Sequence, residues 1–146
     1  MYETILILHS YWAYLVLLIL ILATGNAVFK FFLGKEYSAK DFRIALFTLI
    51  VSHIQLLIGL LLYFVSPRLQ SWSELGMGGV MKDAVNRLYL VEHPTINILA
   101  VALITIGYST HKKKLTSGAK LKKIAIFYTI ALVLILSRIP WSTWLA

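Results

Sequence analysis

Apolar residues occur in four long runs that short polar segments separate. The runs cover roughly residues 5–32, 42–65, 88–108 and 124–141, and a helix needs about 20 mostly apolar residues to cross a bilayer. Over 15–22, 56–62 and 131–136 the apolar residues are continuous rather than alternating, which favours helices over membrane β-strands. We therefore predict an all-α integral membrane protein, a single four-helix up-and-down bundle over residues 1–146.

Composition strengthens the membrane prediction and excludes several kinds of site. Hydrophobic residues make up 60% of the 146-residue chain, which is more than a soluble domain of this size usually carries. The chain has no cysteine, which excludes disulfides, thiolate zinc sites, iron–sulfur clusters and covalently attached c-type haem. The first apolar run lacks a basic leader and a small-residue cleavage motif, so we expect it to remain in the mature protein.

The basic residues predict the orientation of the chain in the membrane. Ten of the fourteen lie in the first and third connections, and connections of this kind face the cytoplasm by the positive-inside rule. The N-terminus, the C-terminus and the 66–87 connection are then outside. We interpret the net charge of +8 as a topology signal with affinity for anionic lipid headgroups, not as a nucleic-acid surface. The ten are Lys30, Lys35, Lys40, Arg43, Lys112, Lys113, Lys114, Lys120, Lys122 and Lys123.

Three histidines, His9, His53 and His93, lie within or beside the apolar runs. Ionisable side chains at membrane depth are costly and usually functional, and neutral imidazole ligates haem iron and copper. A rise of about 1.5 Å per residue places His9 roughly 31 Å and His93 roughly 27 Å above the cytoplasmic ends of their helices. The same estimate places His53 only about 16 Å up, in another layer.

An up-and-down bundle makes the first and third helices diagonal partners, so we predict that His9 and His93 ligate one haem iron from opposite sides. Small and medium-sized residues accompany each histidine at helical spacing, which leaves room for a flat macrocycle. The same residues would equally allow close helix packing with no cofactor. Pro94 predicts a kink or a helix start at His93. The two faces are His9, Ala13, Val16, Leu20, Ala23, Ala27, and His93, Asn97, Ala100, Ile104, Gly107, His111.

Charged residues are predicted to surround His93 on the outer side. Arg138 lies in the fourth run and needs a partner, either Glu92 or a haem propionate, unless its side chain extends to the outer headgroups. Arg87 is a second cation for a propionate, and Glu92 could instead orient an imidazole. We expect Trp12 or Trp141 to pack against the macrocycle.

The 66–87 connection is the only one long enough to have structure of its own. Ser71 and Glu74 form an S-x-x-E capping box, which predicts a short interfacial helix. Three glycines between positions 76 and 79 should break it, and Asp83 should cap the third helix. The segment is then either a lid over a cofactor or an ordinary connection that Trp72 anchors to the membrane interface.

The other two histidines have simpler interpretations beside the functional ones. His111 precedes three lysines, so we expect it to be solvated in the cytoplasmic headgroup region. His53 has Ser52 and Gln55 as neighbours at mid-membrane. It could donate a hydrogen bond to a metal-ligating residue, contact a quinone, take part in a proton relay, or be a hydrogen-bonded structural histidine. If the third helix is shifted, His53 with His93 becomes the competing ligand pair.

Four segments resemble a known family: His9-Ser-Tyr-Trp-Ala-Tyr, Ser52-His53-Ile-Gln-Leu-Leu-Ile-Gly, Glu92-His93-Pro94 and Ser137-Arg138-Ile-Pro-Trp. They are similar to small bacterial four-span membrane proteins commonly labelled cytochrome b. The resemblance spans the whole chain and implies a multi-pass protein of the bacterial cytoplasmic (inner) membrane, with His9, His53, Glu92, His93 and Arg138 as its polar signature. The Glu-His pair and the His-x-Gln-x-x-x-Gly segment are also similar to half of a haem A synthase or a copper-resistance membrane domain. The fourth run lacks the histidine that a haem A synthase half carries.

Two function classes follow. The first is a b-type cytochrome that binds haem b through the iron ligands His9 and His93, with His53, Arg138, Arg87 and Glu92 around the cofactor. It would pass electrons from a quinol or a partner cytochrome to an outer-side acceptor. The second is a non-enzymatic accessory subunit without cofactor, docked on a larger respiratory or other membrane complex. A copper-handling protein is less well supported because no methionine cluster accompanies the histidines, and no substrate-binding motif predicts an enzymatic reaction.

Overall fold

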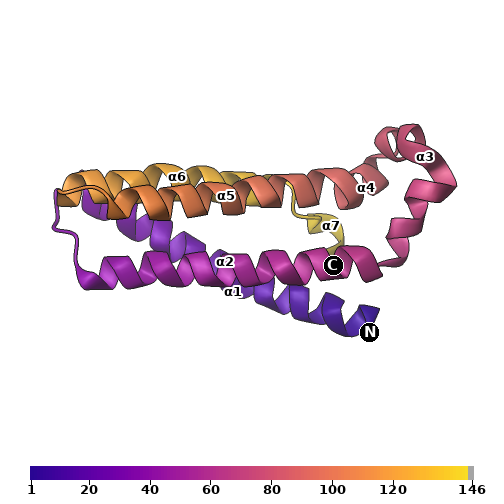
Figure 1. Cartoon of the computed structure of the whole chain (residues 1–146), viewed down its shortest axis with the longest axis horizontal. Helices are drawn as coiled ribbons and strands as arrows, with labels where there is room; N and C mark the ends of the chain where they lie inside the picture. The colour runs from indigo at the N-terminus through magenta and orange to yellow at the C-terminus, as the bar shows by residue number, and fades with distance from the viewer. Residues whose placement is uncertain (145–146) are drawn as a thin grey trace.

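The computed structural model describes residues 1–144, and this part of the chain is helical with no strand. Two sharp turns join helices within pairs, and a longer helical connection joins the two pairs (Figure 1). The long helices are α1 (Tyr2–Phe32), α2 (Ala39–Val65), α5 (His93–Lys112) and α6 (Ser117–Ser137). The short ones are η1 (Pro67–Gln70), α3 (Ser71–Lys82), α4 (Ala84–Arg87), η2 (Leu88–Glu92) and α7 (Trp141–Trp144).

The long helices run up and down side by side, and their order places the first opposite the third. Helix α1 packs against α2 and α6, and α5 packs against α6 and α2. Helices α1 and α5 are therefore diagonal, as the sequence predicts. The α1–α2 and α5–α6 turns lie at one end of the bundle, which we call the hairpin end. The N-terminus, α3 and α7 lie at the other, which we call the cavity end (Figure 1).

Length and composition make three helical segments capable of crossing a membrane: Tyr2–Phe32, Ala39–Val65 and Ala84–Lys112. Their outward faces carry large exposed apolar side chains, including Leu18 and Leu57, which suits a lipid environment. Helix α6 differs because Lys120, Lys122 and Lys123 occupy its first two turns, so a shorter apolar stretch remains. It also ends at Ser137, before Pro140, and not at residue 141 as the sequence predicts.

The bundle core is built from the two faces that the sequence analysis identifies. Leu20, Ala23 and Ala27 of α1 are buried against Ala100 and Ile104 of α5 and against α6. Small residues let the helices approach closely. At Gly107 the approach is so close that an added Cβ would lie 2.5 Å from the Cβ of Phe127. Over this half of the bundle the small residues serve packing, which is one of the two interpretations left open above.

Polar side chains at the hairpin end hold one another in the protein interior. The Asp41 carboxylate is 3% exposed and accepts hydrogen bonds from Lys30 Nζ at 2.5 Å and Asn26 Nδ2 at 2.7 Å. Lys30 lies on α1 and Asp41 on α2, so the ion pair fixes these helices to each other. Tyr128 of α6 donates to the backbone oxygen of Ala45 at 2.8 Å.

His111 belongs to the same hairpin-end interior, and its predicted solvation is wrong. Its side chain is fully buried, because Tyr37 of the 33–38 loop contacts it from outside the last turn of α5. Its Nδ1 donates to the Tyr108 oxygen at 2.5 Å, and its Nε2 accepts from the Tyr37 hydroxyl at 2.8 Å. Burial, together with Asp41 and Tyr108, raises the pKa of Tyr37 to about 12, so Tyr37 keeps the proton that it donates.

The connection at the cavity end confirms the predicted helix but not its predicted cap. Ser71 is itself helical, and the residue before α3 is Gln70, with no side-chain cap. The cap lies earlier, where the Ser66 hydroxyl accepts from Arg68 N at the start of η1. Gly76 breaks α3 as expected, at a φ of 69° that favours glycine. Asp83 caps α4 by accepting from the backbone N–H of Val85.

Candidate functional site

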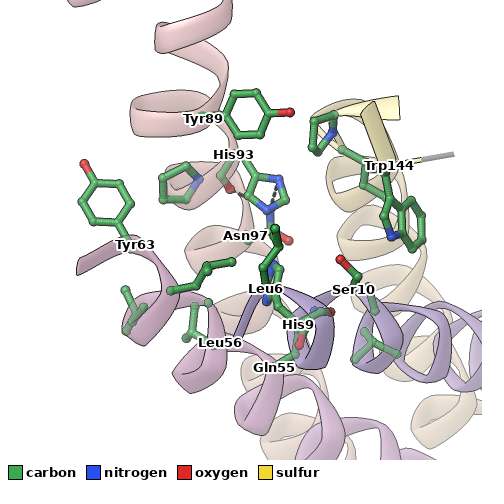
Figure 2. A pocket seen from close by; sticks show the side chains of 18 of the residues that line it. Leu6, His9, Ser10, Gln55, Leu56, Tyr63, Tyr89, His93, Asn97 and Trp144 are labelled. Atoms are coloured by element: carbon green, nitrogen blue, oxygen red, sulfur yellow. Dashed lines mark hydrogen bonds between the residues drawn. The ribbon is translucent and has the colours of Figure 1, made fainter. Parts of the chain in front are cut away.

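A cavity of about 630 Å³ lies at the cavity end, between α1, α2 and the start of α5. Leu6, His9 and Ala13 line it from α1, and the side chains shown in Figure 2 converge on it from the surrounding helices. Ligand cavities commonly have about 300 to 1,000 Å³, so this one has room for a cofactor. No residue of α3 lines it, so the described structure gives α3 no role as a lid.

The side chains of His9 and His93 meet across this cavity. Their ring centroids lie 6.2 Å apart with the ring planes at 83°, and Figure 2 shows one imidazole directly above the other. Imidazoles that bind one metal ion from opposite sides keep their centres about 6 Å apart, since a metal–nitrogen bond is about 2 Å long and the ring centre lies about 1 Å behind the nitrogen. The predicted equal height of the two histidines is confirmed.

Local sequence at the start of α5 orients His93. Residues Leu88–Glu92 form a π-helical turn, a rare element that often marks functional sites, and Pro94 stands in the first turn of α5. His93 Nδ1 donates to the backbone oxygen of Arg138 at 2.9 Å. Because a carbonyl can only accept, this bond places the proton on Nδ1 and leaves a lone pair on Nε2. Metal-binding histidines are typically held in this way.

His9 lies against α2 on a glycine. A Cβ added to Gly59 would lie 3.0 Å from His9 Cε1, so glycine lets the imidazole approach α2 closely, and a larger residue would push the ring away. Gln55 Nε2 donates to the His9 backbone oxygen at 2.9 Å, and Trp12 Nε1 donates to the Val51 oxygen at 2.9 Å. These bonds fix α1 to α2 beside the cavity. His9 Nδ1 is buried and has no hydrogen-bond partner within residues 1–144.

The charged residues predicted around His93 pair with one another. Glu92 accepts from Arg87 Nε at 2.9 Å, and its other oxygen lies 3.7 Å from Arg138 Nε. Of the two partners predicted for Arg138, the structure brings Glu92 to it. All three side chains lie outside the cavity lining, and the cation that lines the cavity is Arg68. Its guanidinium lies 4.1 Å from the ring centre of Tyr89, which holds it by a cation–π contact.

The C-terminal helix α7 closes one side of the cavity. Trp144 lines it and packs against Tyr14 of α1, with ring centroids 4.6 Å apart. Thr143 is hydrogen-bonded to the Tyr89 hydroxyl. Trp12 and Trp141, the aromatic residues expected to contact a macrocycle, do not line the cavity, and Trp144 takes this place instead.

His53 is not brought to the cavity. Its side chain is exposed on the outer face of α2, where Nδ1 donates to the Leu49 oxygen at 2.8 Å and Nε2 lies 3.3 Å from the Thr105 hydroxyl. The alternative ligand pair of His53 with His93 is therefore not assembled. Its neighbours Ser52 and Gln55 do line the cavity from the opposite side of α2.

Two residues at the cavity had no predicted role: Gly59, which enters only as the end of the His-x-Gln-x-x-x-Gly resemblance, and Arg68. Gly59 is a glycine inside an apolar helix, four residues after Gln55, and such a position often marks close approach of another group. Arg68 is one of several charged residues in the 66–87 connection, and nothing in its spacing sets it apart.

Comparisons with known proteins leave the site to be interpreted from its geometry. No family model, no curated protein and no solved structure matches this chain. Within residues 1–144 there is also no cluster of three or more histidine, aspartate or glutamate side chains arranged to hold a metal ion. A metal at this site would have the two imidazoles as its protein ligands, and its other ligands would come from a cofactor or from water.

Proposed function

We propose that this protein is a b-type haem protein of the bacterial cytoplasmic membrane that transfers electrons, with His9 and His93 as the two axial ligands of the iron. The observation that carries the proposal is the pair of imidazoles facing each other across a cavity at 6.2 Å. A packing histidine normally satisfies its nitrogens with neighbouring groups, as His111 does. The close contact of the His9 ring with Gly59 and the hydrogen bond from His93 Nδ1 to the Arg138 backbone oxygen also suit a ligand pair.

The residues around the cavity have distinct parts in this proposal. Haem, when bound, supplies a one-electron carrier in a low-dielectric site. Leu6, Leu56 and Leu90 give the cavity an apolar lining, which would lower the dielectric constant around the cofactor. Arg68 is the cation best placed to pair with a propionate, while Arg87 and Arg138 stabilise Glu92 and, through the Arg138 backbone oxygen, His93. Arg87 and Arg138 thus help to position Glu92 and His93 and do not pair with a propionate.

The proposed membrane arrangement has four spans with both termini outside. The hairpin end carries ten of the fourteen basic residues, which supports a cytoplasmic position for it by the positive-inside rule. Helix α6 then spans the membrane with the lysines of its first two turns in the inner headgroup region. The cavity lies near the outer surface, so electrons from a quinol or a partner cytochrome would leave on the outer side.

The test is the optical spectrum of the purified protein with mass spectrometry of any bound cofactor. We expect a Soret band and split reduced α and β bands. His9→Ala and His93→Ala should each abolish the split bands, whereas His53→Ala and His111→Ala should keep them. Loss of the bands on replacing His53 would refute the ligand pair. Failure of the wild-type protein to bind added haemin would refute the function.

A cofactor-free accessory subunit is the second candidate, and one observation favours it. His53 is an exposed imidazole in the middle of an apolar helix, and polar groups on a lipid-facing surface are costly. A partner protein that covers this face would remove the cost. Co-purification of a stoichiometric membrane partner, lost in His53→Leu and with no haem in either sample, would support this candidate.

A further inference from the structure

The helical turn before His93 contains a backbone oxygen that has lost its α-helical partner. In an α-helix the N–H of residue 94 would donate to the oxygen of residue 90, but Pro94 has no N–H and stands in the first turn of α5. Leu90 is 5% exposed, so solvent does not simply replace the missing donor. An unpaired buried carbonyl oxygen is costly, and this one therefore calls for a donor from elsewhere in the bundle.

Tyr63 of α2 supplies a donor to this oxygen. Its hydroxyl donates to the Leu90 oxygen at 3.0 Å and accepts from Trp72 Nε1 at 2.9 Å. The directions of both bonds are fixed, because a carbonyl oxygen only accepts and an indole N–H only donates. Trp72 therefore leaves the single proton of the Tyr63 hydroxyl for Leu90, and hydrogen bonds linked in this way strengthen one another.

This pair of hydrogen bonds reaches His93 through one turn of backbone. The Leu90 carbonyl belongs to the π-helical turn that leads into His93, and the N–H of His93 bonds within the same turn. Tyr63 lines the cavity together with His93 (Figure 2). Trp72 belongs to α3 and is outside the lining. The 66–87 connection is thus joined to the site although α3 does not cover it.

We propose that Tyr63 and Trp72 position His93 by replacing the donor that Pro94 removes, so that the 66–87 connection sets the orientation of this imidazole. Tyr63 is then a positioning residue, and Trp72 keeps its hydroxyl donating toward the turn. Groups behind a metal-binding histidine tune the metal by fixing the ring. The positioning rests on the hydrogen bonds of the protein itself, whereas its effect on an iron ligand rests on the proposed function.

NMR of the cofactor-free protein in detergent tests the positioning. The Nδ1–H of His93 donates to the Arg138 oxygen at 2.9 Å, and Tyr63→Phe should weaken this bond and move its proton resonance upfield. The amide N–H of His93 should exchange with solvent about fivefold faster, the effect of one hydrogen bond. A general loss of stability would not move the resonance, because the resonance belongs to the folded state. Tyr14→Phe, which removes another tyrosine hydroxyl from the cavity lining, is the matched control and should leave both values unchanged.

Restoring the backbone donor tests why Tyr63 matters. Pro94→Ala returns an N–H to residue 94, so in this background Tyr63→Phe should change the exchange of the His93 amide by less than about twofold. An undiminished effect there would overturn the replacement of the lost donor. Unchanged His93 signals in Tyr63→Phe would overturn the proposal as a whole.

Trp72→Phe tests the link to the 66–87 connection. It keeps an aromatic ring but removes the indole N–H, so it should move the His93 resonance in the same direction as Tyr63→Phe and by less. An unchanged resonance would remove the connection from the proposal. In the haem-loaded protein, Tyr63→Phe should also alter the ferric EPR g values, which report the angle between the imidazole planes, 83° in this structure. Failure to bind haemin would leave the NMR results unaffected and would count only against the proposed function.

Discussion

The two ends of the bundle each bury histidine, and they hold it differently. At the hairpin end both nitrogens of His111 have protein partners, Tyr108 O and Tyr37 Oη. At the cavity end His93 has a partner on one nitrogen, and His9 has a buried nitrogen with none in the described chain. A burial cost that the fold itself compensates indicates a structural role, whereas an uncompensated one calls for a partner that the described chain does not supply.

The same contrast extends to the surrounding packing. Around His111 the polar groups form a closed set in which Asp41, Lys30 and Tyr128 bond to protein atoms on neighbouring helices. Around His9 the helices separate to leave the cavity. We therefore expect substitutions at the hairpin end to change stability and substitutions at the cavity end to change ligand binding.

The largest effect should come from the buried ion pair at the hairpin end. Asp41→Ala leaves the Lys30 ammonium, 17% exposed, without its partner, and losses of this kind cost about 3–5 kcal/mol. The free energy of unfolding, measured by reversible SDS titration in mixed micelles, should fall by that amount. Glu36→Ala, at an exposed position in the same connection, is the matched control and should change little. Equal losses in the two variants would contradict the closed network.

Replacing each of the two contrasted histidines by leucine should have opposite effects on the cofactor-free protein. His111→Leu leaves the Tyr37 hydroxyl and the Tyr108 oxygen unpaired, which should cost about 2–3 kcal/mol of unfolding free energy. His9→Leu removes an unpartnered buried nitrogen, so it should be neutral or stabilising. The same SDS titration compares them, and a loss in His9→Leu as large as in His111→Leu would remove the distinction between the ends.

Glycine substitutions sharpen the comparison further. Gly107→Ala brings a Cβ to 2.5 Å from Phe127 Cβ, and such overpacking should cost about 1–3 kcal/mol. Gly59→Ala meets only the edge of His9 at 3.0 Å, so stability should hold while the haem spectrum or affinity changes. Gly25→Ala, with open space around the new methyl, should gain about 0.5–1 kcal/mol. A normal spectrum in Gly59→Ala would show that its contact with His9 does not matter for the cofactor.

The smallest predicted effect is a pH dependence from Tyr37. Its pKa is raised in the folded protein from 10.0 to about 12, so the folded state keeps a proton that the unfolded chain loses. This contribution is fully present below about pH 10 and is lost as the pH rises toward 12. Thermal unfolding followed across this range should show a steeper loss of stability in the wild type than in Tyr37→Phe. Parallel curves would rule Tyr37 out as the cause.

Much of the architecture could be predicted from the apolar pattern alone. The runs set four long helices, and the spacing of Leu20, Ala23, Ala100 and Ile104 correctly identified the buried faces. Equal depth in the bundle likewise brought His9 opposite His93. These successes share a cause, since helical rise and periodicity are local properties that the sequence carries directly.

The failures arose where tertiary contacts decide the outcome. The three lysines that follow His111 predict a surface residue. Instead, the loop that contains Tyr37, 74 residues earlier in the chain, covers His111, and the Tyr37 hydroxyl donates to it. Arg87 was predicted as a cation for a propionate, but it pairs with Glu92, which the sequence offered as a partner for Arg138. Ser71 lost its capping role because η1 begins the helical connection earlier. The spacing of residues along the sequence does not show which of several nearby partners a polar group binds.

The π-helical turn at Leu88–Glu92 has a consequence for how this protein can diverge over evolutionary time. Such a turn contains one residue more than an α-helical turn, so loss of a single codon there would rotate the preceding segment by about 100° around the axis of α5. His93 and everything after it would keep their register. One short insertion or deletion can therefore re-aim the 66–87 connection toward different neighbours without rebuilding the histidine pair.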